Sequence, residues 1–433
     1  MIHFYQLATM DAAQRARLLR RSELRIDDLI EQVRPIVQAV RERGDEALVE
    51  CTARFDHVQL ASGGLRVSRA EIEEAYQALD LDIRAAIEHA IRNVRVFHEH
   101  QMPHEQWYTQ VAPGVMAGEK ITAITSVGLY VPRGKGAFPS VMYMLATPAS
   151  IAGVPRIVVC TPPGPDGKVD PASLVAADLC GVHEIYRAGG AQAIAALGYG
   201  TASIARVHKI TGPGSGYVAA AKRLLYGTVD VGLPAGPSES ILLADDGAEA
   251  ELVARDLLIE AEHGPDSSSL LLTDSPRLIQ AVQALLPEKI AALPEWRRNF
   301  CRAVFESPEG TGGLVLTSTM AEAVAFVNEY APEHLEVQVR EPFALLPELR
   351  NAGEILLGPH TPICTGNYSL GTNAVLPTGG FAHTFSTTSV YDFLKRTSVA
   401  YLTQAGYDSL SETTRRLATF EGFPAHANAV TDR

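Results

Sequence analysis

The sequence predicts an α/β protein with two Rossmann-like, incompletely doubly wound domains, helices at the N-terminus and a C-terminal extension. Short β-branched runs alternate with helical stretches from about residue 123, and a second series of this kind begins near residue 238. Strands separated by helical stretches favour parallel sheets built from βαβ units. A chain of 433 residues with 46% hydrophobic and 20% charged residues is also long enough to bury two cores.

The N-terminal part of the chain has a helical pattern. Ser68 and Glu71 have the spacing of a capping box, and isoleucines recur on one helix face between residues 83 and 91. The expected division is an N-terminal helical segment at residues 1–25 and a first, discontinuous α/β domain made of residues 26–105 and 238–380.

Two series of strands and helices follow from the alternating pattern. Residues 123–237 are expected to form a second Rossmann-like α/β domain, and the spacing of its strands suits right-handed crossovers. Its strands are expected at 123–131, 156–160, 184–190 and 206–212, and its helices at 140–154, 171–180 and 216–227. The other series predicts strands at 238–246, 268–275, 312–319 and 353–358 and helices at 248–263 and 320–331.

The C-terminal segment, residues 381–433, ends in a short helix and a tail. It is too small to bury a core of its own. We therefore expect this segment to dock on another domain or on a partner subunit.

Charge and cysteine usage narrow the class of protein. The formal net charge of −13 would repel nucleic-acid phosphates and anionic lipid, so neither nucleic acid nor a membrane is an expected partner. The five cysteines are scattered and form no CxxC pair, which favours a reducing compartment over a disulfide framework. The first residues lack the apolar core of a signal peptide, and no run is long enough to span a bilayer. A cytoplasmic protein is expected.

Two glycine-rich loops lie between an expected strand and a helix, at residues 187–194 (RAGGAQAI) and 210–218 (ITGPGSGYV). Glycines permit tight turns and let backbone amides approach an anion at a helix N-terminus. Neither loop matches the GxGxxG dinucleotide fingerprint, and Pro213 removes one amide donor. By themselves the loops favour structural turns over a phosphate site.

Two pairs of an acidic residue and a histidine are candidate chemical groups. Glu260 and His263 stand three residues apart at the end of a long helix, so one face could present both to a divalent metal. The structural alternative is a histidine near the helix C-terminus and a surface carboxylate. Glu333 and His334 follow Pro332 at a helix-to-strand junction and could transfer protons, although a coincidental dipeptide in a turn is the alternative.

A family resemblance emerges from the motifs taken together. The chain contains, in order, GLYVPRG, GGAQAIAALGYGT, GPG, LPAGPSE, AEHGPD, NEYAPEHLE, LGTN with VLPTGG, and AHANAV. In order and spacing these motifs resemble the histidinol dehydrogenase family from about residue 25 to the end. The resemblance implies a homodimer whose C-terminal segments are exchanged into the partner's active site. It also implies oxidation of an amino alcohol through an aldehyde to an acid, with two NAD and one zinc ion per subunit.

The resemblance assigns roles to individual residues. His334 matches the general base of the family, and Glu333 the carboxylate that activates water for the aldehyde step. The remaining matches are Tyr130 and Gln192 for NAD, Ser238 for the substrate, and Glu421 for the substrate's ammonium group in the partner's site.

The expected metal ligands, which also border the substrate, depart from the family pattern of Gln, His, Asp and His. The matching positions hold Glu260, His263, Asn367 and His426, so a carboxylate and a carboxamide have exchanged places. The set still sums to one carboxylate, one carboxamide and two imidazoles, which predicts retained zinc binding. Ser215 also stands where the family usually has an asparagine that contacts NAD.

These departures leave the substrate open. The leading hypothesis is an NAD- and zinc-dependent dehydrogenase that converts a small primary alcohol to an acid, with L-histidinol to L-histidine as the family reaction. Changes of polar groups at a site can alter discrimination by orders of magnitude, so a relative acting on another polar alcohol, such as a sulfopropanediol, is the first alternative. The second is a non-catalytic, metabolite-binding homologue.

Overall fold

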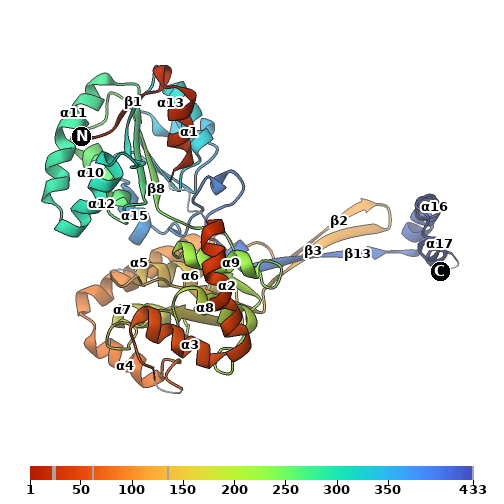
Figure 1. The fold of residues 1–433 in the computed structure, drawn as a ribbon. Helices are drawn as coiled ribbons and strands as arrows, with labels where there is room; N and C mark the ends of the chain where they lie inside the picture. The colour runs from red at the N-terminus through yellow and green to blue at the C-terminus, as the bar shows by residue number, and fades with distance from the viewer. Residues whose placement is uncertain (22–25, 61–62, 134–135, 432–433) are drawn as a thin grey trace.

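The computed structural model describes residues 1–21, 26–60, 63–133 and 136–431. Two α/β units, each built on a parallel sheet, lie one above the other in Figure 1, and a thin arm extends from between them. The expected α/β class with parallel sheets is therefore confirmed. The boundary of the expected N-terminal segment, near residue 25, lies outside the described residues.

The first unit contains a six-stranded parallel sheet with the strand order β1-β10-β9-β8-β11-β12. Its strands read as nearly continuous apolar runs because both faces are covered. One face packs against α10, α11 and α12, and the other against α13 and Leu18 of α1. The strands are β1 (Phe4–Gln6), β8 (Glu239–Ala244), β9 (Ser268–Thr273), β10 (Gly313–Leu316), β11 (His334–Gln338) and β12 (Glu354–Leu357). The helices are α1 (Ala12–Arg20), α10 (Ala250–Ala261), α11 (Pro276–Ala292), α12 (Glu295–Glu306), α13 (Met320–Tyr330), α14 (Pro342–Leu345) and α15 (Ile363–Tyr368).

The second unit contains a four-stranded parallel sheet with the order β6-β5-β4-β7. Four helices bury one face of this sheet and four others bury the opposite face. The strands are β4 (Ser126–Tyr130), β5 (Arg156–Thr161), β6 (Glu184–Arg187) and β7 (Lys209–Thr211). The first face carries α4 (Arg69–Ala78), α5 (Leu81–Glu99), α6 (Pro139–Ile151) and α7 (Pro171–Leu179), and the second carries α2 (Ile26–Arg43), α3 (Asp45–Cys51), α8 (Gly190–Tyr199) and α9 (Gly216–Leu225).

The expected assignment of the N-terminal residues to domains is wrong. Residues 26–105 were expected to join residues 238–380, but Ile87 and Ile91 of α5 share a core with Val127 and Leu129 of β4. Residues 1–20 join the six-stranded unit instead, because β1 pairs in parallel with β10. A helical pattern identifies the face that will be buried, but it carries no information on which of two apolar sheets will cover it.

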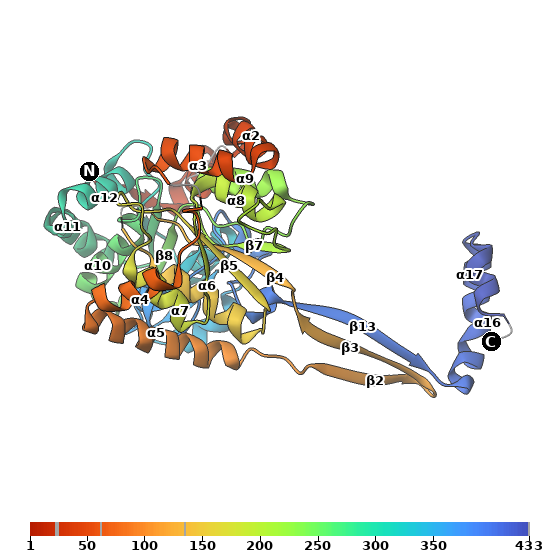
Figure 2. The same ribbon diagram turned by 90° about the horizontal axis from the view of Figure 1, so that it is seen from below.

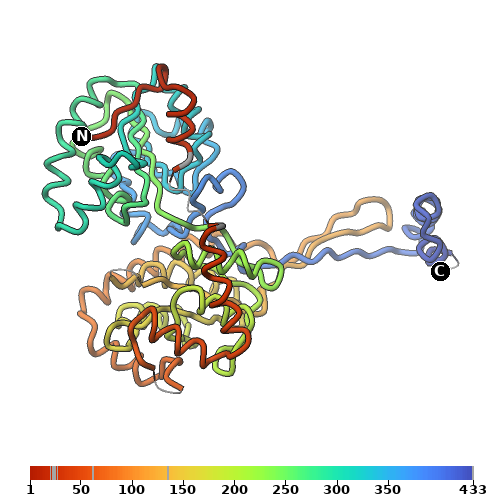
Figure 3. Tube along the Cα trace, viewed as in Figure 1, coloured from red at the N-terminus to blue at the C-terminus, as the bar shows by residue number. Residues whose placement is uncertain are grey.

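A three-stranded antiparallel sheet forms the arm, with the order β13-β3-β2. Figures 2 and 3 show it projecting away from both units and ending in two helices, with the C-terminus at its far end and the N-terminus in the six-stranded unit. The sequence predicted none of these strands, because most of their side chains are exposed on both faces and show no apolar alternation. The elements are β2 (Gln106–Ala112), β3 (Val115–Ala123), β13 (Leu394–Leu402), α16 (Gln404–Phe420) and α17 (Pro424–Ala429).

None of the helices in the described part of the chain combines the length and the apolar character needed to cross a membrane.

Candidate active site

The amino edge of the six-stranded sheet brings most of the candidate residues together. Three neighbouring strands begin there, β8 at Glu239, β11 at His334 and β12 at Glu354. Glu260 reaches the same edge from the last turn of α10, which runs back along the sheet. Glu333 directly precedes β11, so the acid and the imidazole that form the expected pair enter the site from one backbone turn.

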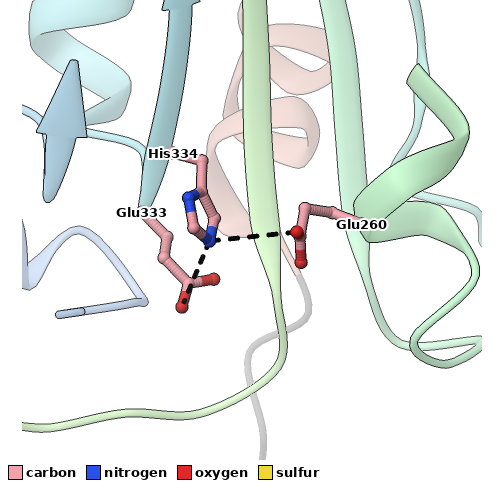
Figure 4. Close-up of side chains that lie close together, drawn as sticks. All are labelled: Glu260, Glu333 and His334. Atoms are coloured by element: carbon pink, nitrogen blue, oxygen red, sulfur yellow. Dashed lines mark ion pairs between the residues drawn. The ribbon is translucent and has the colours of Figure 1, made fainter. Parts of the chain in front are cut away.

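Glu260, Glu333 and His334 form a buried cluster, drawn in Figure 4. His334 Nε2 lies 3.9 Å from Glu260 Oε1 and 4.0 Å from Glu333 Oε1. The other ring nitrogen, Nδ1, lies 2.8 Å from Glu354 Oε1. The imidazole is therefore enclosed by three carboxyl groups, and the side chains of all three groups are mostly or fully buried.

The electrostatics of the cluster separate its proton-binding groups. Burial raises the pKa of Glu333 well above its usual range, and the nearby charge of Glu260 acts in the same direction. Burial alone would lower the pKa of His334, but Glu260, Glu354 and Glu333 together raise it to about 10. Burial opposes the charge on Glu260 as well, yet His263, His334 and the Asn367 amide lower its pKa overall. Strongly shifted, mutually dependent groups of this kind are typical of functional sites.

Glu333 is held in place by the backbone of the neighbouring strand. The Glu239 amide donates a hydrogen bond to Glu333 Oε2 at 2.9 Å. The Glu239 carboxylate in turn pairs with Arg21 Nη1 at 2.7 Å, and both of these side chains are more than nine-tenths buried. Arg21 also lies over the ring of Tyr330, 3.8 Å from its centroid. The segment after α1 thus stabilises the strand that orients Glu333.

Three of the four expected metal ligands meet at this edge. His263 Nδ1 lies 3.2 Å from Glu260 Oε2, and the Asn367 amide donates to Glu260 Oε1 at 2.9 Å. Ser238, the expected substrate contact, lies with its Oγ 2.9 Å from His263 Nδ1. Glu260 Oε2 is buried and makes no hydrogen bond in the described part of the chain, and its neighbour at ion-pair distance, His263 Nδ1, carries a positive charge only when the imidazole is protonated.

A buried carboxylate oxygen that makes no hydrogen bond suits a cation, and so does the position of the cluster at the C-terminal end of α10. Because the nitrogen of the Asn367 amide faces Glu260, its carbonyl oxygen is the atom available as a ligand. Glu260, Glu333 and His334, all among the described residues, each offer a ligand atom within 4.8 Å of the other two, which is close enough to hold a metal ion. The residues present therefore fit a divalent ion.

A cleft of about 980 Å³ reaches the site from the side of His263 and Tyr368. It lies between the two units, because α5 and the residues before α6 line one wall and α12 lines the other. The wall residues include Ile83, Ile87, Phe138, Pro139, Trp296 and Arg297. A cleft of this size can admit a small substrate with part of a cofactor.

The expected NAD-binding residues lie at the carboxyl edge of the sheet in the four-stranded unit. Tyr130 ends β4 and is buried, and its hydroxyl accepts a hydrogen bond from the Gly190 amide at 3.0 Å. Gln192 is buried in the first turn of α8, and Ser215 is the exposed residue that precedes α9. Both glycine loops therefore lie at carboxyl ends of parallel strands and at helix N-termini, where phosphates bind favourably.

The two remaining expected residues lie far from the site of their own chain. Glu421 and His426 lie at the tip of the arm, at the end of α16 and in α17, and both are exposed. Figure 2 shows this tip at the far end of the arm, away from the two α/β units. One chain thus assembles three of the four expected ligands.

Sequence reasoning did not single out Glu354, Glu239 or Arg21. Glu354 had a detectable signal, because it is an acidic residue at the start of an otherwise apolar run, EILL, in a strand expected to be buried. Arg21 had none, since its partner Glu239 is more than two hundred residues away in the sequence.

Comparison with known proteins agrees with this architecture. The sequence profile described as histidinol dehydrogenase matches residues 19–433. "Histidinol dehydrogenase homolog 2" of Mesorhizobium japonicum is 50% identical over 431 residues, covering 100% of this chain and 98% of the relative. "Histidinol dehydrogenase" of Synechocystis sp. is 49% identical over 433 residues, covering 100% and 99%.

A solved structure also matches over nearly the whole chain. The crystal structure of histidinol dehydrogenase from Elizabethkingia anophelis superposes with a TM-score of 0.93 at 32% identity, covering 99% of this chain and 97% of that one. The matching family implies an oxidoreductase. The chain belongs to the histidinol dehydrogenase family.

Proposed function

We propose that the protein is an NAD- and zinc-dependent dehydrogenase that oxidises a small primary alcohol through the aldehyde to the acid. L-histidinol to L-histidine is the family reaction and the first candidate. The observation that carries the proposal is the buried Glu333–His334 pair, whose imidazole Nε2 faces Glu260.

Each oxidation removes a hydride and a proton from the substrate. His334 Nε2 would accept the proton of the hydroxyl, and NAD, when bound, would accept the hydride, which gives the aldehyde. Glu333 would accept a proton from water as the water adds to the aldehyde. Oxidation of the hydrate by a second NAD would give the acid, with the hydroxyl proton passing again to His334 after the first proton has been released to solvent. Glu333 suits this task because a carboxyl group with a raised pKa is a better base than an ordinary one.

Glu260, His263 and Asn367 would hold the zinc ion, with His426 from a second chain as the fourth ligand. When bound, zinc supplies Lewis-acid polarisation of the substrate oxygen. A cation bound to Glu260 would offset the first of the charges that raise the pKa of His334, so more of the imidazole would be neutral and able to accept a proton at Nε2. Zinc sites with mixed nitrogen and oxygen ligands are ordinary for this ion.

NAD would lie along the carboxyl edge of the four-stranded sheet. Tyr130, Gln192 and Ser215 border its two glycine loops, and the N-termini of α8 and α9 point to the same edge. The cleft between the units, which is lined in part by His263, would admit the alcohol.

A homodimer with exchanged C-terminal segments would complete the site. The arm tip carries exposed apolar side chains at Leu417, Phe420 and Phe423 beside Glu421 and His426. Exposed apolar groups next to ligating ones are expected of a surface that docks on another subunit. In this dimer Glu421 would receive the ammonium group of an amino alcohol.

The test is NAD reduction by the purified, metal-quantified protein with L-histidinol, with and without added zinc. Two NADH formed per histidinol consumed, dependent on zinc, would establish the family reaction. Stoichiometric zinc without turnover of histidinol would exclude this substrate, and an NAD-dependent oxidation of another alcohol would remain the proposal. Absence of both zinc and turnover would contradict the proposal and support a metabolite-binding homologue.

A second candidate substrate follows from the exchanged ligands. The carboxylate of Glu260 is on α10 and the neutral amide of Asn367 is on α15, which is the reverse of the pattern expected from the family resemblance. A substrate with a different charge distribution, such as a sulfopropanediol, would then suit the site. Sulfopropanediol should be assayed in parallel, and kcat/KM for the two alcohols compared.

A further inference from the structure

Glu354 is a buried carboxylate beside the reacting groups that the proposed reaction does not yet use. It is the first residue of β12, and β12 pairs in parallel with β11. In the register of this pair Glu354 is the direct partner of His334. The Glu354 amide also donates to the Glu333 carbonyl at 3.0 Å, so the backbone fixes the two residues relative to each other.

The side chain of Glu354 meets the imidazole on the nitrogen that faces away from Glu260. Its Oε1 lies 2.8 Å from His334 Nδ1, and the side chains are 7% and 3% exposed. A carboxylate accepts and does not donate, so the proton of a neutral His334 resides on Nδ1. Nε2 then presents its lone pair toward Glu260 and Glu333.

Other contacts hold the Glu354 carboxylate in one position. The Thr372 hydroxyl donates to its Oε2 at 3.2 Å. Gly366 of α15 leaves the space that the carboxylate occupies, because a Cβ at this position would lie 2.7 Å from Oε1 and 3.0 Å from Oε2. The carboxylate is therefore restrained on the side that faces away from the imidazole as well.

We infer that Glu354 is a positioning residue that fixes the ring orientation and the tautomer of His334. The inference rests on the proposed function, in which His334 Nε2 is the base. A base acts only when the nitrogen that faces the substrate carries the free lone pair, and loss of the group that selects the tautomer lowers turnover without weakening substrate binding. Glu354 thus acts through His334 and does not itself contact the substrate.

The first test uses Glu354→Gln, Glu354→Ala and Glu354→Asp in steady-state kinetics. The amide of Gln is isosteric but can donate to Nδ1 and hold the ring in the opposite tautomer. We expect Glu354→Gln and Glu354→Ala to lower kcat about 10- to 100-fold with KM and zinc content nearly unchanged. Glu354→Asp keeps a carboxylate and should recover part of the loss. A kcat for Glu354→Gln close to that of the wild type would overturn the inference.

The matched control is Glu184→Gln. Glu184 also begins a parallel strand, β6, and is partly buried in an ion pair with Arg156 at 2.6 Å, but it lies in the other sheet. Its substitution should leave kcat unchanged. An equal loss of kcat in this control would show a general structural effect and overturn the inference.

The second test needs no substrate. The imidazole nitrogen resonances of isotope-labelled protein report which ring nitrogen carries the proton. At a pH above the pKa of His334, where its imidazole is neutral, the wild type should show the proton on Nδ1, and Glu354→Gln should move it to Nε2. If the wild type turns over no alcohol, this spectrum still decides the role of Glu354, so failure of the proposed function is distinguishable. A His334 spectrum that Glu354→Gln leaves unchanged would refute the assignment.

Discussion

The two parallel sheets place their candidate chemistry at opposite edges. In the four-stranded unit the expected NAD residues follow strand ends, as Tyr130 does at the end of β4. In the six-stranded unit the acid-base residues precede or begin strands, as Glu333 and His334 do at β11. Ligands of open α/β sheets usually bind at the carboxyl edge, so the second arrangement departs from the rule.

Helix polarity gives a physical reason for the difference. At the carboxyl edge of a parallel α/β sheet helices begin, and their free amides favour phosphate. At the amino edge helices end, and their carbonyls favour cations. Glu260 and His263 lie at the end of α10, on the cation-favouring side. The carboxyl edge of the four-stranded sheet is therefore suited to a dinucleotide, and the amino edge of the six-stranded sheet to a metal ion and proton transfer.

The largest test of this division is His334→Asn. Removing a positioned proton-transfer group should lower kcat by roughly 10²- to 10⁴-fold, while NAD binding at the other edge is nearly unchanged. Steady-state rates and NAD titration by fluorescence measure the two effects. An unchanged kcat would exclude His334 as the base, and a parallel loss of NAD affinity would contradict the separation of the two edges.

The arm is a third region, and its tip is expected to contribute His426 to the site of the partner subunit. An experiment that mixes two variant chains tests this expectation. His334→Asn and His426→Asn chains are each expected to be inactive. After unfolding and refolding together they should regain about a quarter of wild-type activity, because half of randomly formed dimers are mixed and each has one intact site. No recovery would mean that the tip serves its own chain or has no part in the site.

A buried acid pair beneath the amino edge predicts a pH dependence of stability. Burial, together with Asp256, raises the pKa of Glu336 from 4.5 to about 9, although Gln338 and the Ile363 amide act in the opposite direction. Between these two pKa values Glu336 is protonated in the folded chain and ionised in the unfolded chain. The free energy of unfolding should fall as pH rises from about 5 to about 9, by at most about 1.4 kcal/mol per pH unit from this group.

Glu336→Gln removes this titration. The variant should lose less thermal stability than the wild type between about pH 6 and about pH 8, as measured by the shift of Tm over that interval. Equal shifts in the two proteins would show that Glu336 has an ordinary pKa.

The smallest expected effect lies at the carboxyl edge of the four-stranded sheet. Ser215→Asn restores the longer side chain of the family at the exposed start of α9. One added hydrogen bond should lower the KM for NAD about 2- to 10-fold and leave kcat unchanged. A change in kcat with no change in KM would place Ser215 outside the NAD site.

Much of the fold was predictable because its signals are local. Strands such as β8 and β9 are buried on both faces, so their sequences are continuous apolar runs, and the capping box at Ser68 begins α4 as expected. The pairing of β1 with β10 and the packing of α5 on β4 depend on contacts far apart in sequence. The arm strands lacked a signal because a sheet exposed on both faces needs no apolar alternation.

The candidate site was predictable to the extent that its residues are neighbours in sequence or match family motifs. Glu333 and His334 adjoin each other, and Glu260 and His263 share a helix end. Glu354 was missed because only the register of two strands places it beside His334. The roles of Glu421 and His426 remain predictions, since the chain by itself does not carry them to the amino edge.

The pairing of β11 with β12 has a consequence for how this site tolerates mutation. A slip of one residue between the strands would separate His334 from Glu354, but it would also turn Leu335 and Val337, both fully buried, toward the opposite face of the sheet. The same strand register therefore fixes both the distance between His334 and Glu354 and the packing of the hydrophobic core. A point substitution can remove either side chain without moving the strands. A mutation that shifts the strand register would instead disrupt the core and unfold the unit.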